Sequence, residues 1–172
     1  IASNTKERAI GHILLGDPNA KKTITANFIK SAMHLLQLNA TMIQSDFNQV
    51  IANGSSLMVD ASNRLICPEN IFIEPGAVLS GVSLNATEGP IYIGKNALLM
   101  EGAAIRGPFV LGEKSVVKMN ACIYGATSVG PYCTIGGEIK NSILMGYSNK
   151  AHEGYLGDSI IGQWCNIGAG TS

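Results

Sequence analysis

The sequence is poor in charge, in aromatic rings and in histidine. Charged residues make up 14% of the 172 positions and aromatic residues 6%, and there are three histidines. Lys+Arg and Asp+Glu both number 12, so the formal net charge is zero. This balance argues against a nucleic-acid or acidic-membrane partner. We find neither a signal peptide nor an apolar run of 18 or more residues, so we expect a cytoplasmic protein.

Cysteine is present, but not in a pattern typical of metal or redox sites. The four cysteines form neither a CxxC pair nor a close framework: Cys67, Cys122, Cys133 and Cys165. We expect reduced thiols and no bound metal, with Cys133 and Cys165 as small interior side chains. The sequence starts at Ile1 without a Met, and we expect it to be a fragment of a longer protein.

Two stretches with different periods divide the chain. Residues 24–52 are predicted to be helical, because apolar residues recur there on one stripe. The stripe holds Ile24, Phe28, Ala32, Leu35 and Leu36, and a second one holds Ile43, Phe47, Val50 and Ile51. We expect Asn39 to interrupt the helix and Asn53-Gly54 to end it. We assign residues 1–56 to a helical linker and residues 57–172 to a β-rich domain.

From Ile93 onward, aliphatic residues recur at every sixth position. They are Ile93, Leu99, Ile105, Leu111, Val117, Ile123, Val129 and Ile135. Four positions after each stands a second, mostly small class: Ala97, Ala103, Phe109, Ser115, Ala121, Thr127, Cys133 and Ile139. An α-helix would turn every sixth side chain about 240° away. Short strands with a corner every six residues fit the pattern, so we predict a parallel β-helix of hexapeptide repeats with about 18 residues per coil.

The repeat extends in both directions and then changes phase. Ile73 and Leu79 begin two earlier hexads. After Ile135 the phase slips by two, and we expect the next interior positions to be Ile143, Asn149, Tyr155, Ile161 and Ile167. Asn149 and its partner Glu153 are polar, which suggests that the coil is pushed outward between residues 149 and 154. Such departures from a local pattern tend to mark function, although a solvated loop with an incidental His152 is the plain alternative.

The end of the chain carries a family resemblance. The order Glu138-Ile139-Lys140, His152-x-x-Tyr155-Leu156-Gly157-Asp158 and Asn166-Ile167-Gly168-Ala169-Gly170-Thr171 resembles the acetyltransferase domain of the bacterial bifunctional N-acetylglucosamine-1-phosphate uridylyltransferases. In that family a nucleotidyltransferase domain leads through a helical linker into a left-handed β-helix that trimerises. The resemblance covers about residues 45–172. Phrases such as GPIYIGKNALLMEGAAIRGPFVLGE look closer still to Bacteroidetes-type sugar-1-phosphate nucleotidyltransferase homologues.

The resemblance implies a role for each matching residue. His152 would be the general base for the acetyl-accepting amine, a task that suits an imidazole with its ordinary pKa near 6.5. Lys140 would hold the sugar phosphate, and Tyr155 and Asn166 would hydrogen-bond sugar or phosphate oxygens. The backbone at Ala169 would lie near acetyl-CoA, the implied co-substrate. An upstream nucleotidyltransferase domain would bring Mg²⁺ with it.

The sequence also departs from the family pattern. The family has an Arg that contacts the sugar-nucleotide phosphates one coil before the Lys, and Tyr124 takes this substrate-binding position here. A phenol cannot supply a bidentate cationic clamp. Ala151 stands for a Gly, and Glu153-Gly154 replace an apolar-Thr pair. The sequence ends at Ser172, before the Asn-Tyr-Asp-Gly stretch and the later coils that build the family's CoA site.

Two functions remain open. One is acetyl transfer from acetyl-CoA to the amine of a hexosamine-1-phosphate, and the other is a trimerising, ligand-binding β-helix of a glucose-1-phosphate thymidylyltransferase-like enzyme whose catalytic domain lies outside this sequence. Both imply a sugar-1-phosphate or nucleotide sugar as partner, and a homotrimer fits the outward apolar residues Met119, Tyr132 and Trp164. A β-helix carbonic anhydrase, a third class, needs three imidazoles around a metal, and this region offers His152 alone.

Overall fold

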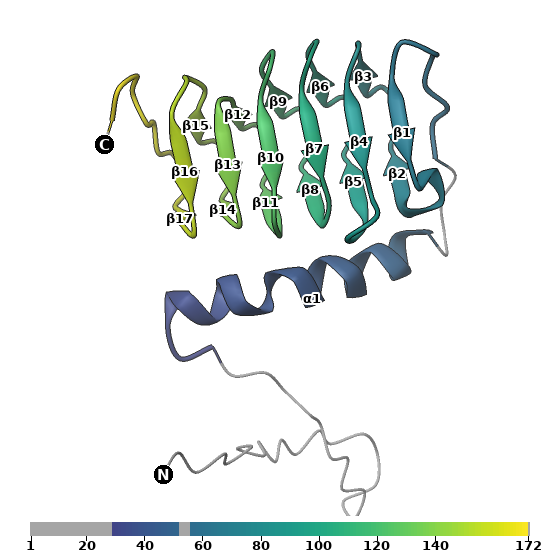
Figure 1. The fold of residues 1–172 in the computed structure, drawn as a ribbon. Coiled ribbons are helices and arrows are strands. Elements are labelled where there is room, and N and C mark those ends of the chain that lie inside the picture. Colours follow the sequence, from purple (N-terminus) through teal and green to yellow (C-terminus); the bar gives the residue numbers. More distant parts are fainter. Residues whose placement is uncertain (1–28, 52–55, 172) are drawn as a thin grey trace, which may run out of the picture. The chain divides into compact units, whose positions relative to one another are not determined.

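The computed structural model describes residues 29–51 and 56–171. Residues 32–172 form one compact unit, which begins with helix α1 (Ala32–Ile51). Short parallel strands then wind around three sides of each coil. A single 3-10 turn, η1 (Pro68–Asn70), follows the first of these strands. Figure 1 shows these coils stacked in sequence order, so that each strand pairs with a strand of a neighbouring coil, and the strands inside the stack pair with one on either side.

Three parallel sheets form the sides of the stack. Sheet A contains β1 (Arg64–Ile66), β4 (Ser83–Asn85), β7 (Ala104–Arg106), β10 (Cys122–Tyr124), β13 (Glu138–Lys140) and β16 (Tyr155–Gly157). Sheet B contains β2 (Ile71–Ile73), β5 (Ile91–Ile93), β8 (Phe109–Leu111), β11 (Thr127–Val129), β14 (Ile143–Leu144) and β17 (Ile160–Ile161). Sheet C contains β3 (Val78–Leu79), β6 (Leu98–Leu99), β9 (Val116–Val117), β12 (Thr134–Ile135) and β15 (Asn149–Lys150). The predicted left-handed β-helix is therefore confirmed.

The hexapeptide pattern is confirmed from Ile73 to Ile139. Every predicted aliphatic position in this range is buried, and so is every member of the second, mostly small class from Ala97 onward. Parallel pairing stacks equivalent residues into columns along the axis, for example Leu79, Leu99, Val117 and Ile135 in sheet C. Burying one such side chain contributes roughly 1.5–3 kcal/mol, so each column stabilises the stack.

The predicted phase beyond Ile135 is wrong by one residue in the next coil. Leu144, Lys150 and Leu156 pair with Val129, Ile135 and Ile139, whereas Asn149 and Tyr155 are exposed and Ile143 lies only partly buried. The reason is that this coil is shorter: Val129 pairs with Leu144, fifteen positions on, while Leu111 pairs with Val129, eighteen positions on. Glu153 is exposed as well. The predicted and observed interior positions coincide again at Ile161, which pairs with Leu144.

Helix α1 runs along the stack and contacts β11 of sheet B (Figure 1). Its buried face holds Leu36, Asn39, Ile43 and Phe47, a spacing that keeps these side chains on one side of a helix. The expected interruption at Asn39 is wrong. The side-chain amide of Asn39 donates to the carbonyl of Ala126 at 2.7 Å and accepts from Ser128 Oγ at 2.7 Å, so the polar residue joins the helix to sheet B. The predicted helical positions Ile24 and Phe28 lie outside the described residues.

One corner of the coils carries an aromatic ladder. Tyr132, Tyr147 and Trp164 occupy equivalent corner positions with left-handed backbone, and their rings stack with centroids 5.1 and 4.6 Å apart. Tyr132 and Trp164 are exposed, as predicted. Cys133, beside the ladder, is buried as expected, whereas Cys165 is exposed because no described coil covers it. No helix in the described part of the chain is both long and apolar enough to cross a bilayer.

Candidate functional site

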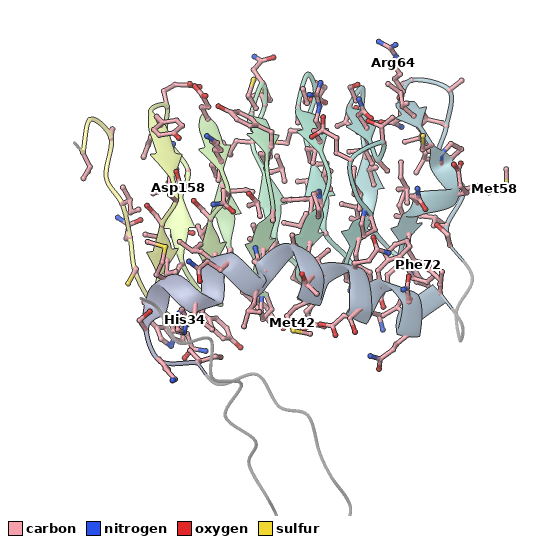
Figure 2. All side chains as sticks on the ribbon, turned by 60° about the horizontal axis from the view of Figure 1, so that its bottom comes forward. His34, Met42, Met58, Arg64, Phe72 and Asp158 are labelled. Atoms are coloured by element: carbon pink, nitrogen blue, oxygen red, sulfur yellow. The ribbon has the colours of Figure 1, made fainter. Side chains whose placement is uncertain are left out.

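The candidate site lies where the last coils leave the regular repeat. Residues 151–154 connect β15 of sheet C with β16 of sheet A, and His152, Glu153 and Gly154 are all exposed. A cavity of about 210 Å³ opens between this loop and the segment that follows β17. Its lining includes Lys150, His152, Tyr155 and Leu156 from one side and Gly168 and Thr171 from the other. Figure 2 shows Asp158, which follows β16, in this end region of the stack, far from Arg64 and Phe72.

Lys150 forms the inner wall of the cavity. It occupies the interior column of sheet C, with its side chain 5% exposed. Its Nζ donates to the carbonyls of Gly136 at 2.8 Å, His152 at 2.7 Å and Gly154 at 2.6 Å. Burial lowers the pKa of the Lys150 ammonium below its ordinary value, and the charge of Glu153 acts in the opposite direction.

The outer face of sheet A brings together three of the predicted residues. Tyr124 pairs with Lys140 on the neighbouring strand, and Tyr155 pairs with Glu138. All four side chains point away from the axis, because the intervening residue on each strand faces inward. Lys140, Glu138 and Tyr155 are exposed. Lys140 therefore has a phenol on the preceding strand, with no second cation at the paired position.

Tyr124 is engaged with Glu138. Its hydroxyl donates to the Glu138 carboxylate, and this hydrogen bond, with smaller contributions from desolvation and from the charge of Glu138, raises the pKa of Tyr124 to about 12. Tyr124 thus remains a neutral donor at physiological pH, and Glu138 sets a negative charge two residues from Lys140. This negative charge opposes the binding of an anion at Lys140.

Asn166 and Ala169 lie one coil further on. Asn166 pairs with Asn149 through an isolated parallel bridge at the end of sheet C, and the Ile167 amide donates to the Asn149 carbonyl at 2.9 Å. Ala169 is exposed between two glycines, which leaves its backbone open to a ligand. Within one chain, His152 and Tyr155 share the cavity and Ala169 follows its wall residue Gly168. Lys140, Tyr124 and Asn166 are not among the residues that line it.

Sequence reasoning missed Lys150 and Thr171. The signal for Lys150 was present in the repeat, since the correct phase places it where Leu79, Leu99 and Val117 stand in earlier coils. A lysine in such a column is an anomaly that periodicity can detect. Thr171 gave no signal of its own. In the described part of the chain, no group of three His, Cys, Asp or Glu residues gathers as a metal site would require.

Comparison with known proteins gives a consistent set of relatives. No protein-family model matches the chain. Curated relatives named bifunctional protein GlmU match it from Synechococcus elongatus (29% identity over 130 residues, 70% of this chain and 28% of the relative), Clostridium acetobutylicum (28% over 159 residues, 83% and 34%) and Bordetella parapertussis (33% over 122 residues, 65% and 27%). The chain spans about a third or less of the length of these relatives.

The similarity and the fold point the same way. The matched part of each relative is long enough to include most of the stack, and the chain itself is a left-handed β-helix whose last coils open into a cavity beside His152. The expected resemblance to bifunctional GlmU proteins is thereby supported. These relatives do not bear on the closer likeness to Bacteroidetes-type homologues, which stays a prediction.

Proposed function

We propose that this β-helix transfers acetyl from acetyl-CoA to the amine of a hexosamine-1-phosphate. The observation that supports this most is the cavity shared by His152 and Tyr155, on a β-helix similar to part of bifunctional GlmU proteins. His152 lines the cavity and is exposed, so a bound amine could reach its imidazole. A general base contributes about 10²–10⁴ in rate when it is positioned on the proton it removes.

The proposed chemistry needs one proton transfer and one acyl transfer. The amine nitrogen attacks the thioester carbonyl, and His152 accepts a proton from that nitrogen as the new C–N bond forms. The C–S bond then breaks, the amide carbonyl is restored, and the sulfur leaves as the thiol of CoA after taking up a proton. Tyr155, which lines the same cavity, would donate to a sugar oxygen.

The remaining predicted residues would bind the two substrates. Lys140 would hold the sugar phosphate as a point charge, with Tyr124 beside it in place of a second cation. The exposed backbone around Ala169 would accept the acetyl-CoA chain, and Asn166 a sugar or phosphate oxygen. Because Lys140 and Asn166 do not line the cavity of a single chain, we infer that a neighbouring copy in a homotrimer completes the site.

Thiol release measures this function directly. The full-length protein is mixed with acetyl-CoA and glucosamine-1-phosphate, and free CoA is followed with a thiol reagent. We expect His152→Ala to lower kcat by about 10²-fold or more, and the matched variant His34→Ala, in α1, to retain turnover.

Turnover that persists in His152→Ala would refute the assigned base. If the wild-type protein releases no CoA from any hexosamine-1-phosphate but still binds a nucleotide sugar, acetyl transfer fails, and the non-acetylating, ligand-binding β-helix takes its place.

A further inference from the structure

Lys150 is a buried cation that the proposed reaction does not use. We propose that Lys150 is the positioning residue of the site: its ammonium fixes the loop of residues 151–154 and so determines where His152 stands. The effect on catalysis rests on the proposed function, whereas the effect on the loop does not. Lys150 Nζ makes three hydrogen bonds, two of them to carbonyls of the loop itself.

The hydrogen bonds of Lys150 match the capacity of an ammonium group. A charged lysine has three N–H donors and no acceptor. Its three carbonyl partners lie at 2.6–2.8 Å, and two of them belong to His152 and Gly154, on either side of Glu153. Because both carbonyls point toward Nζ, the peptide bonds that follow His152 and Gly154 are held in one orientation. His152 itself is exposed and lines the cavity.

Packing alone does not account for a lysine at this place. The equivalent residues of the preceding coils are Leu99, Val117 and Ile135, all 0% exposed. An aliphatic residue would continue the column without taking a charge out of water, which is costly even when the charge is paired. What Lys150 provides and an aliphatic residue cannot is a donor for the His152 carbonyl and a second donor for the Gly154 carbonyl, which also accepts from the Glu138 amide. The loop has left the hexapeptide path, so the neighbouring strands cannot pair with all of its backbone groups.

The coil beneath is shaped for the same ammonium. Gly137 has a left-handed φ of 71°, and a Cβ on it would lie 2.7 Å from Lys150 Nζ, 2.8 Å from the Gly154 carbonyl oxygen and 2.9 Å from the His152 carbonyl oxygen. Gly136 offers its carbonyl to the same Nζ. The absence of a side chain at Gly137 therefore leaves the space that the ammonium and both loop carbonyls occupy.

The test compares Lys150→Met with Lys95→Met, a matched change at an exposed lysine. We expect Lys150→Met to keep the stack folded, since methionine fills an aliphatic column. Backbone order parameters of residues 152–154 should fall from about 0.85 to below about 0.6. The amide of Glu138, which donates to the Gly154 carbonyl, should exchange at least about tenfold faster, while the Lys118 amide one coil earlier keeps its rate. Lys95→Met should change none of these.

Other outcomes overturn the proposal. Unchanged order parameters in Lys150→Met would show that the loop does not need the ammonium, and loss of protection at both Glu138 and Lys118 would show a purely structural role. If Lys150→Met does not fold, the wild-type protein decides: nitrogen-15 spectra should show a slowly exchanging Lys150 ammonium, unlike that of Lys95, and its absence refutes the proposal.

Turnover gives a separate readout. If the wild-type protein transfers acetyl groups, Lys150→Met should lower kcat at least about tenfold with the KM for acetyl-CoA unchanged within about twofold, and Lys150→Arg should restore part of kcat. An unchanged kcat overturns the positioning role in catalysis. If the wild-type protein shows no acetyl transfer, the proposed function fails while the loop measurements still decide the role of Lys150.

Discussion

Removing one interior side chain tests whether the columns hold the stack. Ile123 is 2% exposed and pairs with Ile105 and Ile139 on the neighbouring strands of sheet A. Truncation to alanine removes apolar contact with both neighbours and leaves a cavity between two coils that cannot close, because the backbone ladders fix the coil spacing. Such changes cost about 2–5 kcal/mol. We therefore expect Ile123→Ala to lower the free energy of unfolding by about 3 kcal/mol, a large share of the roughly 5–15 kcal/mol typical of a domain.

Aspartate at the same position should be far worse. It adds the cost of an unpaired charge in the column, so we expect Ile123→Asp to unfold the coils around it. Urea denaturation followed by far-ultraviolet circular dichroism measures both variants, with Met58→Ala and Met58→Asp as matched changes at a 93% exposed position. The Met58 changes should stay within about 0.5 kcal/mol. A folded Ile123→Asp protein with an unchanged midpoint, or an Ile123→Ala loss no larger than that of Met58→Ala, would refute the register.

Two further predictions concern polar contacts. Asn39→Ala should cost about 1–3 kcal/mol in the same assay, because the Ala126 carbonyl and the Ser128 hydroxyl lose their partner; a loss no larger than that of Asn48→Ala, an exposed site on the same helix, would contradict it. Absorbance at 295 nm should show Tyr124 ionising near pH 12, a step missing from Tyr124→Phe and shifted toward pH 10 in Glu138→Gln. Since folding raises this pKa, the contribution of Tyr124 to stability is complete below about pH 10 and is lost as the pH rises through about 12. A Tyr124→Phe spectrum that loses its step near pH 10 instead would contradict the assignment.

The sequence predicted the regular coils well, because their period has one physical cause. Each interior residue must face the axis, so eight aliphatic positions in strict phase from Ile93 to Ile135 leave one register to choose. The helix was predictable for a similar reason, from the stripe that ends in Phe47 and Ile51. What the stripe could not show was that Asn39 has partners on sheet B, since the contact joins residues 87 and 89 positions apart in the chain.

The register failed where two candidate interior residues stand side by side. Ile143 and Leu144 are both aliphatic, so composition cannot decide which of them faces the axis, and the answer depends on the length of a corner that only the stacked structure fixes. Choosing Ile143 made Asn149 the anomaly in the next hexad, whereas Leu144 makes it Lys150. Either choice places a polar residue, Asn149 or Lys150, at an interior position, so both identify the same region as irregular.

The nature of the anomaly changes the mechanism that follows from it. An asparagine pushed outward would leave residues 151–154 as a loop held by its ends alone, and His152 would be free to move. A buried ammonium that binds the carbonyls of His152 and Gly154 holds the same segment in one conformation. A base must stand within hydrogen-bond reach of the proton it removes. A shortened coil with a cation in its core thus places one imidazole at a fixed point on a scaffold that otherwise repeats itself. Loss of the Lys150 ammonium should therefore slow the reaction without destabilising the coils beneath the loop.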